Sequence, residues 1–391
     1  MALSETHFMR RLRTHLLCVL ILPGLFGCGS LSPTQTTPAT EHPKNTSTTI
    51  HTSEPQPTEN LAVVPTLSAL PEGWSQIDPG GNSSCARGGK YSFFVRKANS
   101  NKLLIYFEGG GACYDAKTCQ VGAHYFDDSI TATDQADNPA LKTTGVFALN
   151  DERNPFKDYN IVFVSYCTGD AFMGNRVVSY TDGGKSFTVN QVGYLNTQSV
   201  LGWTYQNFAK PDSVFVIGCS AGVVGSFFHA PYMLEQYQNI PFALVGDSGG
   251  GYFDGPASVA KNLGTLEVLP DWLPQYQDLI VNDLIRSRLF FVIPAQAYPN
   301  ARFGLLDTLN DSLQGELISR FNKNLTLAKV LQSNLDDIRV DAPDFYSYTG
   351  PGDYHCITMH PDFYKYEVGG TKLSDWLASL ANGQPVENIM P

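Results

Sequence analysis

Four short apolar runs constrain the fold of this chain more than any other feature of its sequence. They are Lys102–Phe107 (KLLIYF), Asn160–Ser165 (NIVFVS), Ser213–Ile217 (SVFVI) and Phe242–Gly246 (FALVG). Each run is continuous rather than alternating apolar with polar residues, which is typical of strands in a parallel sheet that helices cover. Stretches 191–208 and 222–237 carry helical patterns between these strands. The sequence therefore predicts an α/β fold, with a mostly parallel central sheet covered by helices on both faces.

A serine between two glycines directly follows the third of these runs. Gly218-Cys219-Ser220-Ala221-Gly222 matches the pattern Gly-x-Ser-x-Gly and precedes the expected helix. A serine on a sharp strand-to-helix turn is strained, and side chains at the flanking glycine positions would clash. The N-terminus of the following helix offers backbone N–H groups to a developing oxyanion. We predict that Ser220 is a nucleophile of the α/β-hydrolase type and that Ala221 donates to the oxyanion.

A serine nucleophile needs a base, and histidine is the usual base near neutral pH. In α/β-hydrolases the acid and then the histidine follow the serine along the chain. His229 lies nine residues beyond Ser220 in the same expected helix, about 13 Å away along the axis, which is too far. His355 lies in a glycine-rich segment typical of a loop, whereas His360 precedes Pro361 in a more polar stretch. We therefore predict that His355 is the base.

The acid is less constrained by the residues themselves. Four aspartates follow Ser220 and end apolar segments: Asp247, Asp254, Asp307 and Asp311. Asp247 could orient a base, but a buried aspartate that hydrogen-bonds to loop backbone is the commoner interpretation. Asp307 and Asp311 follow a further apolar run at 301–306, in the place expected for the acid of this fold. Residue type and position alone do not separate these candidates.

A glycine-rich loop, Glu108-Gly109-Gly110-Gly111, follows the first apolar run. Such a loop brings backbone N–H groups close to a substrate carbonyl. We expect it to complete the oxyanion hole, with a flexible turn as the alternative interpretation.

The N-terminal segment predicts export. Arg10, Arg11 and Arg13 precede an apolar stretch at 16–26, which has about the length of a signal-peptide core and is shorter than the roughly 20 residues of a spanning helix. The stretch ends in Leu25-Phe26-Gly27-Cys28, which resembles a bacterial lipobox. We therefore predict a lipoprotein signal peptide over 1–28 with a lipid on Cys28, and plain secretion is the alternative.

The rest of the chain divides into two predicted parts. Residues 29–66 are rich in Ser, Thr, Pro and Gln and are predicted to form a disordered tether. Residues 67–391 are predicted to form the catalytic domain. The formal net charge of −11 argues against a nucleic-acid partner. We expect contact with a membrane only through the N-terminal lipid, and a monomer.

The cysteines also fit export. With Cys18 in the predicted signal and Cys28 lipid-modified, six of the eight cysteines remain, an even number that favours disulfides in an exported protein. Cys113 and Cys119 flank a short loop and form the most plausible pair, and Cys85 with Cys167 is a plausible second. No paired CxxC or HxxxH spacing is present, so no metal site is expected.

Four motifs, in this order, resemble the pectin acetylesterase family, which includes plant pectin acetylesterases and the animal carboxylesterase Notum. They are LIYFEGGGAC at 104–113, YCTGD at 166–170, GCSAG at 218–222 and GDSG at 246–249. The resemblance implies an α/β-hydrolase fold with a Ser-Asp-His triad and no cofactor. It also assigns roles: Asp311 heads a segment like the family's Asp-Ser-x-Gln, which implies that it is the acid. His355 matches the catalytic histidine, and Gly110 and Gly111 match the loop that donates to the oxyanion.

These features together predict an exported serine esterase that removes acetyl groups from a polysaccharide such as pectin. One alternative is an esterase for longer acyl chains on lipid or protein. Another is a non-catalytic surface lipoprotein that binds glycans, although the presence of all three triad residues argues against it. Four tryptophans could stack on sugar rings, though most tryptophans at such positions belong to the core: Trp74, Trp203, Trp272 and Trp376.

Overall fold

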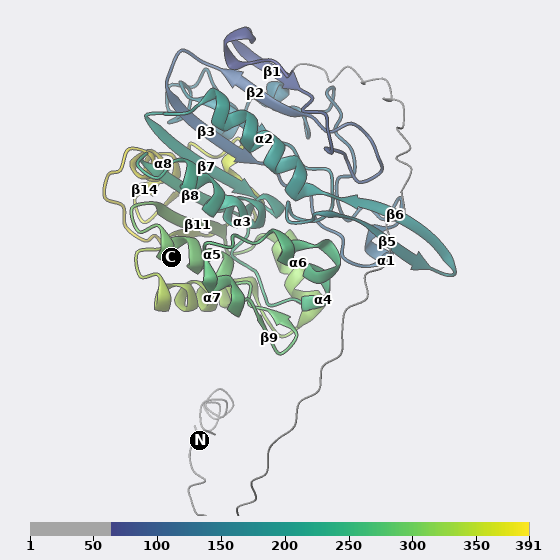
Figure 1. Ribbon diagram of the computed structural model, residues 1–391. Helices are drawn as coiled ribbons and strands as arrows, with labels where there is room; N and C mark the ends of the chain where they lie inside the picture. Colours follow the sequence, from purple (N-terminus) through teal and green to yellow (C-terminus); the bar gives the residue numbers. More distant parts are fainter. Residues whose placement is uncertain (1–63, 391) are drawn as a thin grey trace, which may run out of the picture. The chain divides into compact units, whose positions relative to one another are not determined.

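The computed structural model describes residues 64–390 of the chain, and an eight-stranded sheet runs through them (Figure 1). In spatial order the strands are β1 (Gly73–Ile77), β2 (Phe93–Lys97), β4 (Asn160–Val164), β3 (Lys102–Phe107), β7 (Ser213–Cys219), β8 (Phe242–Asp247), β11 (Arg302–Thr308) and β12 (Tyr346–Gly350). The six strands from β4 to β12 pair in parallel. β1 and β2 add an antiparallel edge. The predicted α/β fold with a mostly parallel sheet is confirmed.

Alternate residues of the central strands enter two separate cores. Along β3, Leu103, Ile105 and Phe107 pack into one hydrophobic cluster, while Leu104 and Tyr106 pack into another. This alternation follows from the pleat, because successive side chains of a strand point to opposite faces of the sheet. The continuous apolar runs in the sequence are therefore the signature of a sheet that is covered on both sides.

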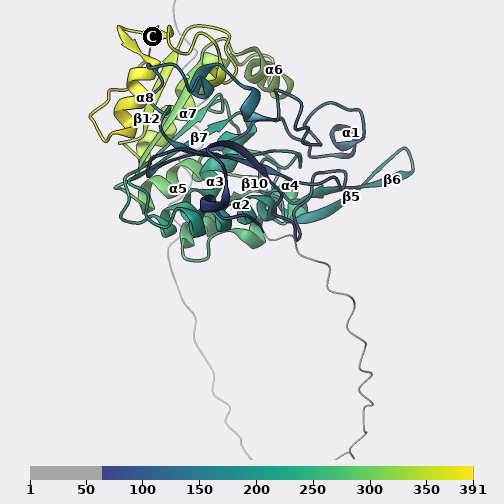
Figure 2. The same ribbon diagram turned by 90° about the horizontal axis from the view of Figure 1, so that it is seen from above.

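Helices supply the other half of each core (Figure 2). α2 (Gly193–Asn207), α3 (Ala221–Gln236), α5 (Leu289–Ala297) and α7 (Leu327–Asp341) contribute to the first cluster. α8 (Leu373–Ala381) contributes to the second cluster, on the other face.

Shorter elements connect these layers. The remaining helices are α1 (Ala116–Cys119), α4 (Ala257–Leu263) and α6 (Ser312–Phe321), and the remaining strands are β5 (Arg176–Asp182), β6 (Lys185–Gln191), β9 (Ile280–Val281), β10 (Leu284–Ile285), β13 (Glu367–Val368) and β14 (Thr371–Lys372). β5 and β6 form a hairpin that projects from the body of the domain (Figure 1). Single 3₁₀ turns lie at Leu67–Ala69, Pro139–Leu141, Gly145–Phe147, Thr265–Val268, Pro274–Asp278 and Ile357–Met359.

The predicted signal peptide (1–28), its Cys28 and residues 29–63 of the predicted tether lie outside the described residues. The last three residues of that tether, 64–66, are described and contact the domain. The Trp203 indole Nε1 donates a hydrogen bond to the Pro65 carbonyl at 2.7 Å, and Val64 packs against the first core cluster. Within residues 64–390, no helix is long and apolar enough to cross a membrane.

Candidate active site

Ser220 lies at the bend between β7 and α3. Its backbone φ of 53° and ψ of −118° form a conformation that a residue with a side chain rarely adopts. Two backbone hydrogen bonds hold the bend: Ser220 N donates to the Asp247 carbonyl, and Val223 N donates to the Ser220 carbonyl, each at 2.9 Å. Neighbouring strand β8 and helix α3 thus fix the serine from both sides.

The glycines on either side of Ser220 are required by close backbone contacts. A Cβ atom at Gly218 would lie 2.2 Å from the Gly222 carbonyl oxygen, and one at Gly222 would lie 2.3 Å from the Phe107 carbonyl oxygen. A Cβ atom at Gly109 would lie 3.2 Å from the Ser220 Cβ atom. The glycine-rich loop after β3 therefore runs directly alongside the serine.

Two glycines of this loop adopt conformations with positive φ. Gly110 has φ of 148° and Gly111 has φ of 72°. A Cβ atom would meet the Tyr166 ring at 2.5 Å in the first case and the Tyr125 carbonyl oxygen at 2.1 Å in the second. In the part of the chain that the structure describes, the backbone N–H groups of Gly110, Gly111 and Ala221 make no hydrogen bond within the protein. Unpaired N–H groups beside a serine are the donors that an oxyanion requires.

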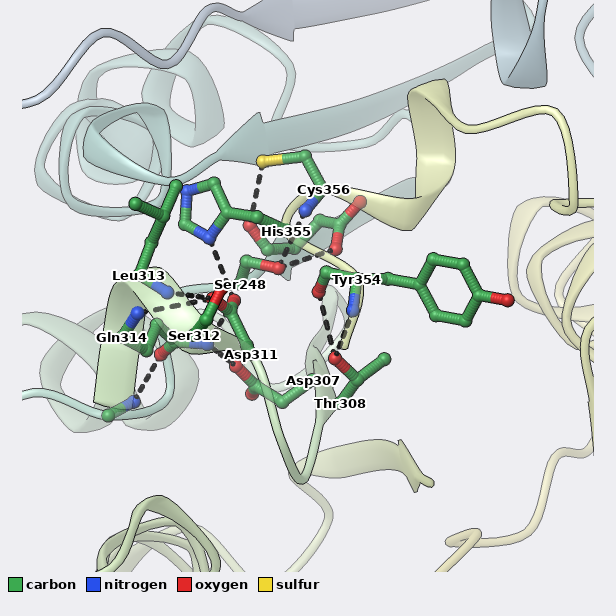
Figure 3. A network of polar contacts seen from close by, with 12 residues as sticks. Ser248, Asp307, Thr308, Asp311, Ser312, Leu313, Gln314, Tyr354, His355 and Cys356 are labelled. Carbon is green, nitrogen blue, oxygen red and sulfur yellow. Dashed lines mark hydrogen bonds and ion pairs between the residues drawn. The ribbon is translucent and has the colours of Figure 1, made fainter. Parts of the chain in front are cut away.

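His355 and Asp311 form a direct pair, with Nδ1 of the histidine 2.8 Å from Oδ2 of the aspartate (Figure 3). The Asp311 side chain is fully buried and that of His355 is 23% exposed. Burial by itself would raise the pKa of Asp311, but hydrogen bonds from His355 and Gln314 bring that pKa below its ordinary value. An ionised carboxylate can only accept a hydrogen bond, so Nδ1 carries the ring proton and Nε2 is left as the basic nitrogen.

A disulfide between Cys219 and Cys356 connects the residue before Ser220 to the residue after His355. The two cysteine Cα atoms lie 5.6 Å apart. Since neighbouring Cα atoms are about 3.8 Å apart, the Cα atoms of Ser220 and His355 can be no more than about 13 Å apart. The disulfide therefore keeps the serine bend and the histidine loop close together.

The end of β8 links the serine bend to the histidine loop a second time. The Ser248 hydroxyl oxygen accepts a hydrogen bond from Cys356 N, and the Asp247 carboxylate accepts one from Thr358 N, each at 2.8 Å. Burial raises the pKa of Asp247 to about 6. Asp247 thus accepts a hydrogen bond from the loop backbone, which is the role that the sequence analysis gave as the alternative to orienting a base.

The other predicted candidates have hydrogen-bond partners other than His355. Asp307 is buried and accepts hydrogen bonds from Gly250 N and the Gln314 side chain. Asp254 accepts one from Ser287 N. Among residues 64–390, Asp311 alone pairs its carboxylate with His355.

The rejected histidine, His229, is buried, and its Nε2 lies 3.0 Å from the Phe172 carbonyl oxygen. Burial lowers the pKa of His229 to about 4.

Asp307 leads to a prediction about stability. Burial raises its pKa from 3.8 to about 7, although hydrogen bonds from Gln314 and Gly250 oppose this rise. Between these two values the folded chain binds a proton that the unfolded chain lacks, so stability falls as pH rises, by up to about 4 kcal/mol. Asp307→Asn should therefore reduce the difference in Tm between about pH 5 and about pH 8 in thermal unfolding.

The same measurement on wild-type protein supplies the reference, because Asp170 and Asp247, whose pKa values burial also raises, are unchanged in the variant. The pH dependence of Asp311 has the opposite sign, since its pKa is lowered. A variant whose Tm follows pH just as the wild type does would contradict a proton on Asp307.

The structure also contains the two disulfides suggested by the sequence, Cys85–Cys167 and Cys113–Cys119. It answers the question of Cys219 and Cys356, whose pairing the sequence left open. An even number of cysteines indicates only that disulfide bonds form. Which cysteines pair depends on which loops meet at the sheet edge. Across the described residues, no group of three or more His, Cys, Asp or Glu side chains is placed to hold a metal ion.

Two of the four tryptophans are buried, which excludes them from stacking on a sugar. Trp203 is 7% exposed and Trp376 is 2% exposed. Trp272 is exposed. Sequence reasoning included Gln314 only as the end of the Asp-Ser-x-Gln segment and gave it no role, yet its side chain contacts both Asp307 and Asp311. Its position three residues after a helix-capping aspartate was the available signal, because a side chain there faces back to the cap.

Comparison with known proteins finds a family model that matches part of the chain. Residues 78–263 match the family model described as Pectinacetylesterase. This range includes the loop at Gly110 and Gly111 and the bend at Ser220, and it ends before Asp311 and His355. Asp311 and His355 are therefore assigned to the candidate site from the structure and not from the family match.

Curated relatives carry two kinds of name. The chain is 31% identical over 147 residues to palmitoleoyl-protein carboxylesterase notum2 of Xenopus laevis, which covers 36% of this chain and 28% of that protein. It is 30% identical over 152 residues to palmitoleoyl-protein carboxylesterase NOTUM of Schmidtea mediterranea, covering 37% and 27%. It is 26% identical over 173 residues to pectin acetylesterase 5 of Arabidopsis thaliana, covering 42% and 37%. The chain thus spans well under half the length of these relatives, and its resemblance to the pectin acetylesterase and Notum family is confirmed.

Proposed function

From the pectinacetylesterase match over residues 78–263, we propose that this protein is a serine hydrolase of carboxylic esters. The observation that carries the proposal is the His355–Asp311 pair, whose loop the Cys219–Cys356 disulfide links to the bend that carries the strained Ser220. A strained serine, a histidine with a free Nε2 and a buried carboxylate behind it are the parts that this chemistry needs.

In the proposed mechanism, His355 Nε2 takes the proton of the Ser220 hydroxyl as Oγ attacks the ester carbonyl carbon. Asp311 keeps the proton on Nδ1 and stabilises the imidazolium. The N–H groups of Gly110, Gly111 and Ala221 bind the oxyanion of the tetrahedral intermediate. When the intermediate collapses, His355 gives its proton to the departing alcohol. A water molecule then attacks the acyl-serine by the same route and releases the carboxylic acid.

The leading substrate is an acetyl ester on a polysaccharide such as pectin. The name of the family model and of the Arabidopsis relative supports this choice. The three disulfides fit an oxidising compartment, so we place the protein outside the cytoplasm, either secreted or anchored through a lipid on Cys28. A polysaccharide substrate would also lie outside the cytoplasm.

A longer acyl chain is the second candidate, because α6 carries exposed apolar side chains close to the site. Leu313 and Leu317 are 57% and 41% exposed, one helical turn apart. The helix begins directly after Asp311, the partner of His355, so Leu313 lies within one turn of the pair. Apolar side chains at this place favour contact with a hydrocarbon chain.

A series of p-nitrophenyl esters separates the two candidates. With acetate, butyrate and octanoate, we expect kcat/KM for the acetate to exceed that for the octanoate by about 10-fold or more if the enzyme is an acetylesterase, since an acyl site that fits only a methyl group rejects added methylenes. Release of acetate from acetylated pectin, followed enzymatically, should accompany this preference. A higher kcat/KM for octanoate, with no acetate released from pectin, would replace the acetyl substrate by the long-chain one.

A further inference from the structure

Gln314 lies between two buried carboxylates next to the His355–Asp311 pair (Figure 3). Its side-chain Nε2 lies 3.0 Å from Asp307 Oδ1 and 3.0 Å from Asp311 Oδ2. Its Oε1 accepts a hydrogen bond from Gly251 N at 2.9 Å. Gln314, Asp307 and Asp311 are 7%, 2% and 1% exposed, so solvent does not substitute for these contacts.

The partners of Gln314 determine which way its amide points. Oε1 faces a backbone N–H donor, and Nε2 faces two oxygens that can accept. Turning the amide over would set its oxygen against two carboxylates and its NH₂ group against an N–H, and all three hydrogen bonds would be lost. The two protons of Nε2 therefore go one to each carboxylate, and the side chain has no second arrangement of equal quality.

Asp311 is immobilised by the same set of contacts. Its Oδ1 accepts hydrogen bonds from Leu313 N and Gln314 N, both at 3.1 Å, as the cap of α6. Its Oδ2 accepts from His355 Nδ1 and from Gln314 Nε2. The backbone of α6 holds one oxygen in place, and Gln314 is the protein's second donor to the oxygen that contacts the histidine. Small errors in the placement of such groups are costly, because the base must be aligned with the nucleophile.

We propose that Gln314 is a positioning residue, which holds Asp311 Oδ2 in line with His355 Nδ1 while Asp307 and Gly251 hold Gln314 itself. The inference rests on the proposed esterase function. Gln314 contacts no reacting atom, and it acts through Asp311. It also separates two carboxylates that would otherwise face each other without a donor between them, which costs free energy in a buried site.

Two variants test this role against p-nitrophenyl acetate. Gln314→Leu removes both donors and adds no charge, and we expect kcat to fall by about 10- to 100-fold at all pH values with KM nearly unchanged. Gln314→Glu puts a third carboxylate between Asp307 and Asp311. At about pH 8 it should lose 100-fold or more in kcat, and the ratio of variant to wild type should recover by about 10-fold toward pH 6, because a protonated Glu donates one hydrogen bond.

The charged groups around Gln314 and its two carboxylate partners come from several elements. Asp307 and Asp311 lie at the end of β11 and the start of α6, Asp247 lies at the end of β8, and His355 lies in the loop after β12. All four are present in both variants and in wild type, but loss of the Gln314 hydrogen bonds raises the pKa values of Asp307 and Asp311, so both variants are compared with wild type over the whole pH profile. Gln332→Glu is the matched control, because Gln332 is exposed on α7 and donates to the Asp336 carboxylate at 2.8 Å. Its kcat and pH profile should match those of wild type.

A second readout does not depend on turnover. The proton that His355 Nδ1 shares with Asp311 should give a far-downfield ¹H resonance, and Gln314→Leu should shift or broaden it while Gln332→Glu should not. If Gln314→Glu does not fold, Gln314→Leu decides alone through kcat and this resonance. A lowered Tm with normal kcat, a normal resonance and an unchanged pH profile would show that Gln314 is only structural. Wild type without turnover, or turnover that does not depend on Ser220, would overturn the proposed serine hydrolase instead, so the two failures are distinguishable.

Discussion

Replacing Ser220 with alanine should lower kcat toward p-nitrophenyl acetate by about 10⁴-fold or more, because the only atom proposed to attack the carbonyl is removed. The fold should survive. Alanine at this bend has the same Cβ atom as serine, so the strained φ of 53° is no harder to adopt. Steady-state kinetics and thermal unfolding of the purified variant measure the two effects separately.

A control and a probe complete this test. Ser226 lies on the same helix, fully buried, and its hydroxyl donates to the Val223 carbonyl. Ser226→Ala should keep kcat, since that hydroxyl is not proposed to take part in the reaction. A fluorophosphonate probe should label wild type and Ser226→Ala, and the label should be absent from Ser220→Ala. Wild-type protein that binds acetylated glycans and yet resists the probe would favour the non-catalytic lipoprotein.

The second large effect concerns the Cys219–Cys356 disulfide. Changing both cysteines to alanine opens a loop with a sequence separation of 137 residues, whose closure is worth about 5 kcal/mol of stability in the chain-entropy model. We also expect kcat of the folded variant to fall by about 100-fold, because the loop that carries His355 loses its covalent bond to the serine bend. Urea unfolding and kinetics below the transition measure the two losses.

The Cys85–Cys167 disulfide is the matched control. Its sequence separation of 82 residues gives a similar entropic contribution, about 4.5 kcal/mol, yet neither cysteine is adjacent to Ser220 or His355. Removing it should cost comparable stability and leave kcat of the folded protein near wild type. Equal effects on kcat from the two removals would mean that general loosening, rather than placement of His355, explains the loss.

Sequence patterns predicted the centre of the sheet because β3, β4, β7 and β8 are apolar on both faces. The edge strands were not predicted. β1 (GWSQI) is mostly half-buried or exposed, so it lacks both a continuous apolar run and a clear alternation. The β5–β6 hairpin is largely exposed along its length and carries the same weak signal. Edge and hairpin strands are decided by backbone pairing, which the side-chain pattern records only faintly.

Parts of the candidate site were predictable to different degrees. Ser220 could be chosen because its glycines, the preceding strand and the following helix all agree. His355 followed from chain order and a glycine-rich loop. The acid could not be chosen by pattern, since Asp247, Asp307 and Asp311 all end apolar segments and differ only in what their carboxylates meet in three dimensions. The family resemblance favoured Asp311, which is the aspartate that contacts His355.

The sulfur bridge behind the serine and the histidine has a consequence for when such a protein can work. A newly synthesised chain in a reducing compartment carries every side chain of the proposed machinery, but no covalent bond yet joins the Ser220 bend to the His355 loop. We therefore expect preparations from a reducing host to be latent, and to gain turnover on air oxidation or with a thiol-disulfide isomerase. Maturation would then coincide with delivery to the place where the ester is found.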